Sequence, residues 1–260
     1  MPDASLAQAD LPPPFPHMDP ELFRRRFGRA WSFEVVEAFD VGARLRRVVY
    51  TAPDLDQFDH KPGQEVILMI PARDGHDRRH YTIRSLDKAA RRIAIDYVLH
   101  GDAPGARHCR SAKAGERLTV LGPRGRHVLK DCADWRLFVG DETAQPAIFA
   151  MLEALPAGAR ADVFLEVVTD ADRQPLESQG EVNLVWLPRD APAGQSQVLL
   201  RAVEGYELSA GEGHVYTLGE TSIIRRVRQH LIGRGVPKAN VHAEGYWRPG
   251  RIGGHEHVDD

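Results

Sequence analysis

Residue types that could bind a cofactor lie together in the hexapeptide RHYTIR at residues 79–84. On a β-strand alternate side chains share one face, which here would carry Arg79 and Tyr81. The opposite face would carry His80, Thr82 and Arg84. A guanidinium can pair with a phosphate, a phenol ring can stack on a flat aromatic ring, and the Thr82 hydroxyl can hydrogen-bond a ring nitrogen. A barrel strand with a packed tyrosine and solvated arginines would have the same sequence, so the hexapeptide alone leaves both interpretations open.

Small residues form a second candidate site at residues 99–106, and the tetrapeptide GPRG follows at residues 122–125. Residues without bulky side chains let backbone N–H groups approach a pyrophosphate, and Gly105 could begin a short helix whose first amides attract an anion. A hairpin loop built from turn residues is the alternative, and it is the simpler interpretation of this segment taken alone. The candidate binding positions are His100, Gly101, Gly105 and Ala106.

A third candidate site, the segment GDETAQPA at residues 140–147, lies between a predicted strand and a predicted helix. Doubly wound folds bind nucleotides at such positions, and the candidate residues are Asp141, Thr143 and Ala144. Carboxylates repel phosphate, so we expect at least one of Asp141 and Glu142 to cap the helix instead. Any phosphate contact would then come from backbone amides around Thr143.

The elements that position these residues fall into two parts. Residues 31–129 show short apolar runs separated by turn residues, which predict strands at 48–50, 65–70, 81–83, 93–99 and 117–121. Strands this closely spaced predict a small antiparallel barrel, which we expect to be six-stranded. After residue 134, apolar strands at 136–139, 163–168, 182–187, 214–218 and 241–243 alternate with helices at 144–155 and 222–232. This order predicts a doubly wound parallel sheet, so the expected fold class is a β-barrel followed by an α/β domain.

The length of 260 residues supports two domains. We place the first at residues 29–131 and the second, with a C-terminal tail, at residues 132–260. Residues 1–28 are expected to be a flexible lead-in, because prolines cluster in them and oppose helix. The tail carries the sequence HEH at residues 255–257, which could ligate a metal but fits a polar terminal tail better.

Composition narrows the classes of partner. Hydrophobic residues make up 42% and charged residues 27%, as in water-soluble globular proteins, and the net charge of -3 gives no global attraction for nucleic acid or an anionic membrane. No apolar run approaches the roughly 18–20 residues that span a bilayer. The two cysteines, Cys109 and Cys132, lack CxxC spacing, which fits a reducing cytoplasm better than a disulfide or zinc site. We therefore expect a cytoplasmic protein without a resident metal. A monomer fits the sequence, which leaves the oligomeric state open.

The order of these segments resembles the FAD-binding domain of siderophore-interacting proteins, the ferric-siderophore reductases of the ferredoxin-reductase superfamily. The segments that carry the resemblance are RHYTIR at 79–84, DYVLHG at 96–101, AGE at 114–116 and GPRG at 122–125. In the second part, GDETAQPA at 140–147, Gly219-Glu220 and GYWR at 245–248 resemble the family's nucleotide-domain motifs. The resemblance spans about residues 31–254.

The resemblance implies FAD bound by the barrel and a reduced nicotinamide, NADH or NADPH, docked on the second domain. It places Arg79 on the pyrophosphate, Tyr81 against the isoalloxazine and Thr82 near its reactive nitrogen. It also adds to the cofactor-binding candidates Glu220, Tyr246 and Trp247. The implied reaction passes electrons from NAD(P)H through FAD to Fe(III) in a siderophore or similar ferric chelate. Iron would leave as Fe(II), and no residue need act as a nucleophile or proton-transfer catalyst.

An anionic ferric siderophore needs cations near the flavin edge, and the candidates are Arg124, Arg126 and Arg248, with Arg251 less favoured. Each of these could instead be an ordinary solvated surface charge. The sequence also departs from the family pattern. Strand 65–70 has no lysine, and His108 and Tyr216 stand where the family usually has tryptophan. The missing lysine bears on substrate affinity and identity, while neither aromatic change removes the flavin site.

The choice of nicotinamide depends on charge near the ribose. Residues 169–173, with the sequence TDADR, contain carboxylates that can accept from a 2'-hydroxyl and an arginine that would welcome a 2'-phosphate. We favour NADH slightly and leave NADPH open. Two other functions fit the sequence: a general flavin reductase that serves a protein partner, and a non-catalytic protein that holds ferric siderophore.

Overall fold

The computed structural model describes residues 19–99, 101–131, 134–251 and 256–258. The chain divides into two compact units, one formed by Met1–Val41 and Leu45–Arg126 and the other by Gly42–Arg44 and His127–Asp260. Each unit has its own sheet and its own apolar core. His100, Cys132 and His255 fall outside the described residues.

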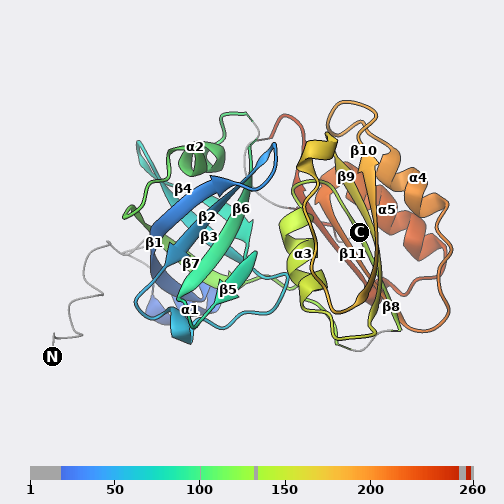
Figure 1. Cartoon of the computed structure of the whole chain (residues 1–260), viewed down its shortest axis with the longest axis horizontal. Coiled ribbons are helices and arrows are strands. Elements are labelled where there is room, and N and C mark those ends of the chain that lie inside the picture. The colour runs from blue at the N-terminus through green and yellow to red at the C-terminus, as the bar shows by residue number, and fades with distance from the viewer. Residues whose placement is uncertain (1–18, 100, 132–133, 252–255, 259–260) are drawn as a thin grey trace. The chain divides into compact units, whose positions relative to one another are not determined.

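The first unit is built on one curled antiparallel sheet (Figure 1). Its elements are α1 (Pro20–Phe27), β1 (Arg29–Asp40), β2 (Leu45–Thr51), β3 (Glu65–Ala72), β4 (Gly75–Thr82), β5 (Ser85–Asp87), β6 (Arg92–Val98), α2 (Pro104–Ser111) and β7 (Arg117–Arg124). The strand order across the sheet is β4-β3-β7-β1-β2-β6-β5. The expected antiparallel β architecture is confirmed. The described residues form a seven-stranded sheet where six strands were expected, and the short β5 pairs with β6.

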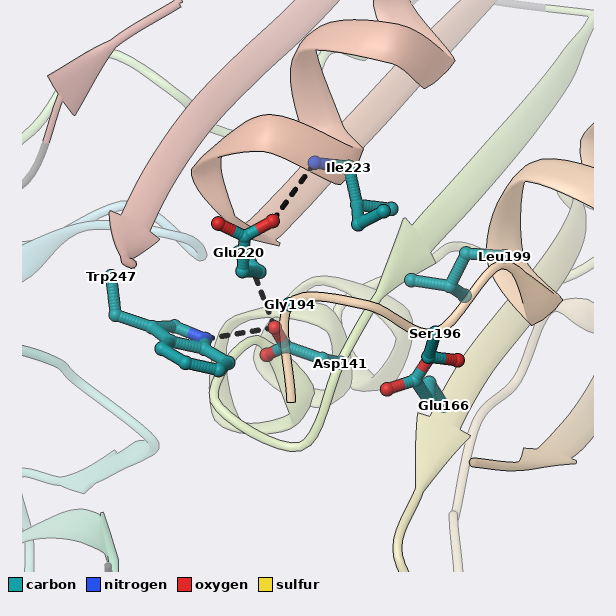
Figure 2. A pocket seen from close by; sticks show the side chains of 8 residues that line it. All are labelled: Asp141, Glu166, Gly194, Ser196, Leu199, Glu220, Ile223 and Trp247. Carbon is teal, nitrogen blue, oxygen red and sulfur yellow. Dashed lines mark hydrogen bonds between the residues drawn. The ribbon is translucent and has the colours of Figure 1, made fainter. Parts of the chain in front are cut away.

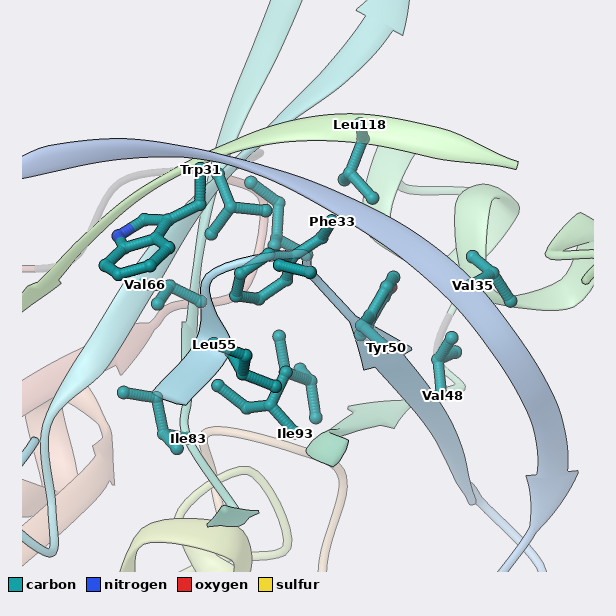
Figure 3. Packing of buried hydrophobic residues seen from close by; sticks show 14 of the residues in the cluster. Trp31, Phe33, Val35, Val48, Tyr50, Leu55, Val66, Ile83, Ile93 and Leu118 are labelled. Carbon is teal, nitrogen blue, oxygen red and sulfur yellow. The ribbon is translucent and has the colours of Figure 1, made fainter. Parts of the chain in front are cut away.

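Alternation along the strands creates the core of this unit. On β1 the residues Trp31, Phe33 and Val35 are buried and the residues between them are more exposed, as a two-residue period requires. Figure 3 shows these side chains packed with Val48 and Tyr50 of β2 inside the curled sheet. The interior is therefore filled by apolar and aromatic side chains, and a cofactor of this unit must bind outside this core.

Strand β4 begins six residues earlier than the strand predicted at 81–83. It pairs with β3 along its whole length, from Glu65↔Thr82 to Ala72↔Gly75. The residues between Gly75 and Tyr81 are charged or polar, so no apolar alternation marked them as a strand. Backbone pairing with the apolar β3, closed by the turn before Gly75, holds this polar strand in place. The ladder positions Arg79 and Tyr81 close to the end of β4.

Helix α1 shows that the lead-in predicted for residues 1–28 is wrong over its last part. Proline is tolerated in the first turn of a helix, where its missing N–H costs nothing, so Pro20 can begin α1. The Asp19 carboxylate caps the helix by accepting from the backbone N–H groups of Glu21 and Leu22, at 3.0 and 2.9 Å. At the other end Phe27 is buried in a cluster with Ile67, Met69 and Leu121.

The second unit is a doubly wound sheet with helices on both faces (Figure 1). Its elements are β8 (Trp135–Gly140), α3 (Gln145–Glu153), β9 (Arg160–Val167), β10 (Glu181–Pro188), α4 (Val198–Glu204), β11 (Gly213–Glu220), α5 (Thr221–Gly233), β12 (Val241–Trp247) and β13 (Glu256–His257). The strand order is β10-β9-β8-β11-β12-β13, with β8 to β12 parallel to their neighbours. The predicted α/β fold is confirmed. The chain changes direction across the sheet between β8 and β11, which is the switch point where such folds bind ligands.

Two elements of this unit were not predicted. Helix α4 has only seven residues and follows a segment rich in turn residues, but Leu199, Leu200 and Val203 bury its apolar side. Strand β13 lies in the C-terminal tail and pairs antiparallel with β12 through Glu244↔His257 and Gly245↔Glu256. Among the described residues, no helix is long and apolar enough to cross a membrane. Nor do these residues contain a His, Cys, Asp and Glu cluster able to hold a metal ion.

Candidate functional site

The end of β4 meets the start of α2 at one close contact. The Tyr81 ring packs on Tyr97 with ring centroids 4.3 Å apart, and burial raises the pKa of the Tyr81 hydroxyl above its usual value. A Cβ atom added to Gly105 would overlap with this hydroxyl. Gly105 therefore has to lack a side chain for the strand end and the helix to come together. Two of the sequence-predicted site segments, 79–84 and 99–106, meet at this point.

The N-terminus of α2 is suited to an anion. Proline stands in its first turn, as its fixed φ favours, and the N-cap residue Ala103 has no side chain that could accept a hydrogen bond. The first-turn amides at Gly105 and Ala106 are thus not capped by a side chain. The short helix considered at Gly105 is present and begins at Pro104, and the hairpin loop that was the simpler interpretation of this segment is wrong. Gly101 precedes it in the left-handed region, with φ of 53°.

Three other residues of the RHYTIR segment have partners within the protein. Arg79 lies near Asp77, with 3.6 Å between Nη2 and Oδ1, and His80 Nδ1 lies 2.7 Å from Glu65 Oε1. Arg84 is buried, with its Nε 3.8 Å from Asp96 Oδ2. Asp96 also forms a two-bond ion pair with Arg47, at 2.6 and 2.8 Å. These pairs fix the conformation of the strand end on which Tyr81 and Thr82 stand.

The candidate substrate-binding arginines lie on both units. Arg124 ends β7 in the first unit, with its Nε 3.6 Å from the same Glu65 oxygen that contacts His80. This Nε is buried and has no hydrogen-bond partner among the described residues. Arg126 is exposed in the first unit, and Arg248 is exposed in the second, directly after β12. Glu65 thus reduces the positive charge that Arg124 would offer an anion.

In the second unit, Asp141 joins three strand ends at the switch point. It follows β8 and is 2% exposed. Its Oδ1 accepts from Thr143 N at 2.9 Å, and its Oδ2 accepts from Glu220 N at 2.8 Å and Trp247 Nε1 at 2.9 Å. Figure 2 shows the indole of Trp247 and the backbone of Glu220 converging on this carboxylate. The sequence-predicted residues Asp141, Thr143, Glu220 and Trp247 are therefore brought together.

The prediction that Asp141 or Glu142 caps the following helix is wrong. Helix α3 has Ala144 as its N-cap, with no side-chain hydrogen bond. The cause is an intervening turn, in which Ala144 N donates to Asp141 O at 2.9 Å and delays the helix to Gln145. Asp141 serves the turn instead, while Glu220 caps α5 by accepting from Ser222 N at 3.0 Å and Ile223 N at 2.9 Å.

A small pocket opens beside this carboxylate. It is lined by Asp141, Glu166, Gly194, Ser196, Leu199, Glu220, Ile223 and Trp247 (Figure 2). Arg189, just past β10, pairs with both Glu142 and Glu166, and Ser196 Oγ donates to Glu166 at 2.6 Å. Burial, together with the nearby Asp141, raises the pKa of Glu142 to about 7 although Arg189 opposes the shift. The pocket is rich in carboxylates whose oxygens already accept from protein donors.

Arg189, Glu166 and Ser196 of this site were not predicted from the sequence. Glu166 had a usable signal, because it is a charged residue inside the apolar run of β9 and must be paired there. Arg189 had the signal of an arginine two residues after the strand predicted at 182–187. Ser196 had none, because its role depends on how the loop between β10 and α4 folds.

The remaining sequence candidates fall in ordered positions. Asp170–Asp172 forms a 3-10 turn after β9, closed by a capping box between Thr169 and Asp172. Arg173 pairs with the 78%-exposed Asp170 at 2.7 Å. His108 Nε2 lies 3.1 Å from the hydroxyl of Tyr50, and Tyr216 stacks on Phe138 with centroids 4.8 Å apart. Tyr246 is half-buried and packs against the core under α3.

The fold, with one candidate site at the junction of β4 with α2 and another at the switch point of the second unit, defines a class of protein. The ferredoxin reductase of carbazole 1,9a-dioxygenase has a TM-score of 0.66 with 17% identity, covering 84% of this chain and 70% of its own, which shows a shared ferredoxin-reductase-like fold. Two family models then match in succession: the siderophore-interacting FAD-binding domain over residues 70–127 and the siderophore-interacting protein model over residues 133–250.

Individual relatives agree with these models. The ferric vibriobactin reductase ViuB of Vibrio cholerae is 30% identical, covering 81% of this chain and 86% of its own length. A siderophore utilization protein from T. fusca has 32% identity and a TM-score of 0.79, covering 86% of this chain and 94% of its own. The chain belongs to the siderophore-interacting protein family, and its first unit contains that family's FAD-binding domain.

Proposed function

We propose that this protein is a ferric-siderophore reductase, which passes electrons from NADH or NADPH through FAD to Fe(III) and releases iron as Fe(II). The observation that carries the proposal is the FAD-binding domain over residues 70–127, which contains the junction of β4 with α2. The relative ViuB, named as a ferric vibriobactin reductase, supports the choice of a ferric chelate as electron acceptor. The reaction needs NAD(P)H and a reducing milieu, so we place it in the cytoplasm.

The residues of the first unit fit FAD. Arg79 and the uncapped first-turn amides of α2 supply positive charge for a pyrophosphate, and the Tyr81 ring supplies a flat aromatic surface beside them. Gly105 permits the close approach of these groups. His80 and Arg84, which pair with Glu65 and Asp96, hold the strand end in position. When bound, FAD accepts two electrons as a hydride and can pass them on singly.

The residues of the second unit fit a nicotinamide nucleotide at the switch point. Asp141 fixes the turn that carries Thr143 and Ala144, and it orients Trp247 at the end of β12. Glu220 is the last residue of β11, and Tyr246 lies next to Trp247 in β12. In the loop after β9, Arg173 is paired with the exposed Asp170, and Asp172 is buried and accepts from Thr169, so NADH and NADPH both stay candidate reductants.

The ferric chelate would be bound by Arg124 and Arg126 of the first unit, and Arg248 of the second unit is a separate candidate. One nicotinamide supplies two electrons, which reduce two Fe(III) ions to Fe(II). Fe(II) carries less charge and is held less tightly by hard, anionic oxygen ligands. The chelator is therefore not consumed. Arginines that attract the ferric chelate electrostatically need not affect reduction of the flavin by the nicotinamide. Binding of the chelate and electron transfer can therefore be measured separately.

The test is an anaerobic experiment in two halves on purified protein loaded with FAD. We expect the visible flavin absorbance to bleach on addition of NADH or NADPH, and to return on addition of ferric chelates while a ferrous chelator captures Fe(II). Protein that does not retain FAD, or reduced flavin that is stable toward every ferric chelate, would refute the proposal. Tight binding of ferric chelate without flavin would indicate a carrier protein instead.

A further inference from the structure

Strand β10 forms one edge of the second unit's sheet. It stands at the end of the strand order, and among the described residues it pairs with β9 alone. Glu181 N donates to Ala159 O at 2.8 Å, so the odd-numbered residues of β10 direct their backbone groups toward β9. Backbone groups alternate between the two sides of a strand, so those of Val182, Leu184 and Trp186 point to the open edge. None of these three residues has a backbone hydrogen bond to another element in the described part of the chain.

The other sheet edges in the described ranges carry features that discourage pairing with another chain. Strand β4 is charged or polar along most of its length, β5 has three residues and β13 has two. Charge and short length are usual protections of a sheet edge. Strand β10 has eight residues, no charged residue after Glu181 and no bulge in its register with β9. Its last residue, Pro188, limits pairing only at that end.

The apolar side chains of β10 extend both cores of the second unit to this open edge. Val182, Leu184 and Trp186 pack against the core that contains α3, and Leu187 packs against the core that contains α4 and α5. No residue of β10 is buried, whereas every residue of β8 and β11 is buried. A long, apolar and unprotected edge strand is a template for pairing with a further strand.

The sequence of β10 is complementary to itself when two copies pair antiparallel about Leu184. In that register Leu184 faces Leu184 of the second copy, and Val182 faces Trp186 of the second copy. Aliphatic pairs and pairs of an aromatic with a β-branched side chain stabilise neighbouring strands, and each outward-facing pair exchanges two backbone hydrogen bonds. Glu181 faces Leu187 of the second copy, so the carboxylates of the two copies do not oppose each other.

We propose that two copies of this chain associate through β10, which joins their second-unit sheets antiparallel about a two-fold axis. The self-complementary register favours a second copy over a strand from another protein. A two-fold contact occupies the edge of both copies, so assembly stops at the dimer. This dimer does not depend on the proposed electron transfer, because β10 contributes no residue to the candidate FAD site.

The first test measures the mass of the full chain by sedimentation equilibrium. We expect a reversible dimer with a Kd on the order of 10 µM, because a pair of strand edges makes a small interface. Concentrations from about 1 to about 200 µM bracket this value. A wild-type chain that stays monomeric throughout would overturn the proposal and leave the edge to a different protein. Assemblies larger than the dimer would overturn the two-fold contact.

Leu184→Pro removes an N–H that does not serve the ladder to β9. Proline is tolerated on an edge strand where its nitrogen faces outward, so the variant should fold, which circular dichroism and the melting temperature check. The dimer Kd should rise at least about tenfold, because both copies lose a hydrogen bond at the two-fold axis. Leu184→Ala, the matched control, shortens the side chain but keeps the N–H and should weaken the dimer much less. Equal weakening by both substitutions would overturn pairing through the backbone.

Leu184→Lys and Leu184→Glu test the register without removing any backbone group. Each variant alone should be monomeric, because like charges stand directly opposite each other at the two-fold axis. An equimolar mixture of the two should form a one-to-one dimer, since opposite charges then meet. Dimers of either variant alone, or a mixture that stays monomeric, would overturn the placement of residue 184 opposite its own copy.

Amide hydrogen exchange, followed by NMR, supplies a control within the same strand. The amides of Val182, Leu184 and Trp186 should exchange rapidly in dilute protein and become protected as the concentration rises. The amides of Asn183 and Val185 face β9 and should be protected at every concentration. Protection of the outward amides that does not change with concentration would contradict the dimer.

Discussion

At the scale of single residues, the proposed FAD site depends on the lack of a Cβ atom at Gly105. Tyr81 extends from β4 so close to α2 that a Cβ at Gly105 would overlap with its hydroxyl. Packing a side chain into an already filled interior typically costs about 1–3 kcal/mol. The contact therefore ties the identity of residue 105 to that of residue 81.

We expect Gly105→Ala to weaken FAD retention by roughly 5- to 150-fold, the range that overpacking of ~1–3 kcal/mol would give. Tyr81→Phe removes the overlapping hydroxyl, so the double variant Gly105→Ala with Tyr81→Phe should recover part of the loss. Gly233→Ala, at a helical position where an added Cβ meets nothing, is the control and should keep FAD as wild type does. The measurement is FAD titration followed by fluorescence; a double variant no better than Gly105→Ala would argue against the contact.

A second residue-scale prediction concerns Glu65, which lies between His80 and Arg124. Because Glu65 partly neutralises Arg124, Glu65→Gln should speed reoxidation of the reduced flavin by anionic ferric chelates, and Arg124→Ala should slow it. Each change should be about three- to tenfold, and it should shrink at high salt because the charges are partly exposed. Stopped-flow traces of both half-reactions decide the matter. Equal effects on flavin reduction would contradict the role given to Arg124.

The residue types predicted which side chains lie close together better than they predicted the role of each side chain. The composition of the segment 140–147 predicted a ligand site at a strand end, and Asp141, Thr143, Glu220 and Trp247 do converge. The capping role failed because one extra turn moved the helix start beyond the reach of Asp141. A one-residue shift in a turn leaves no mark in apolar periodicity, so the sequence could not supply it.

At the scale of elements, β11 and β12 are joined by a stack of rings at their first residues. The ring centroids of His214 and His242 lie 5.2 Å apart, and His242 also stacks on Tyr216 at 4.9 Å. Burial, with smaller contributions from His214, His127 and Lys130, lowers the pKa of His242 to about 4. The folded state therefore holds this imidazole neutral.

This lowered pKa predicts a loss of stability in acid. The unfolded chain takes up the His242 proton near its ordinary pKa of 6.5, whereas the folded chain resists until about pH 4. The stabilising contribution is present above pH 6.5 and is lost as pH falls toward 4, by about 1–3 kcal/mol. His242→Phe keeps the stacking and should flatten this part of the profile in urea unfolding. An unchanged pH dependence in the variant would show that other groups cause it.

Elements with strong periodicity were the ones that the sequence predicted well. The strand predicted from the alternation in β6 and the helix predicted for the amphipathic α5, which follows Gly219-Glu220, matched the structure closely. Strand β4, helix α1 and helix α4 were misjudged because each depends on a neighbour: β4 on its ladder to β3, α1 on the cluster around Phe27, and α4 on the buried Leu199. Tertiary contacts of this kind override local propensity.

At the scale of the whole molecule, the proposed reaction assigns FAD to the first unit and the nicotinamide nucleotide to the second. The first unit contains the FAD-binding domain, and the second contains the switch-point site ordered by Asp141. Variants in one unit should therefore leave the other unit's binding step intact. This separation can be tested with a residue of the second unit alone.

Trp247→Phe removes the indole N–H that donates to Asp141 but keeps an aromatic ring at the end of β12. We expect flavin reduction by NADH or NADPH to slow by about 10- to 150-fold, which corresponds to the roughly 1.5–3 kcal/mol of one hydrogen bond to a charged group. FAD affinity and reoxidation by ferric chelates should remain as in wild type. Loss of FAD from this variant would mean that the two cofactor sites are not independent.

Helix α1, at the beginning of the described chain, covers an apolar part of the first unit's sheet. Phe27 packs on Ile67, Met69 and Leu121, which would otherwise form a solvent-exposed apolar patch on the sheet. A protein shortened to begin after Gly28 should keep its flavin reduction and reoxidation. It should aggregate on storage at concentrations at which the full chain stays in solution. Its solubility, more than its catalysis, would depend on those eight residues.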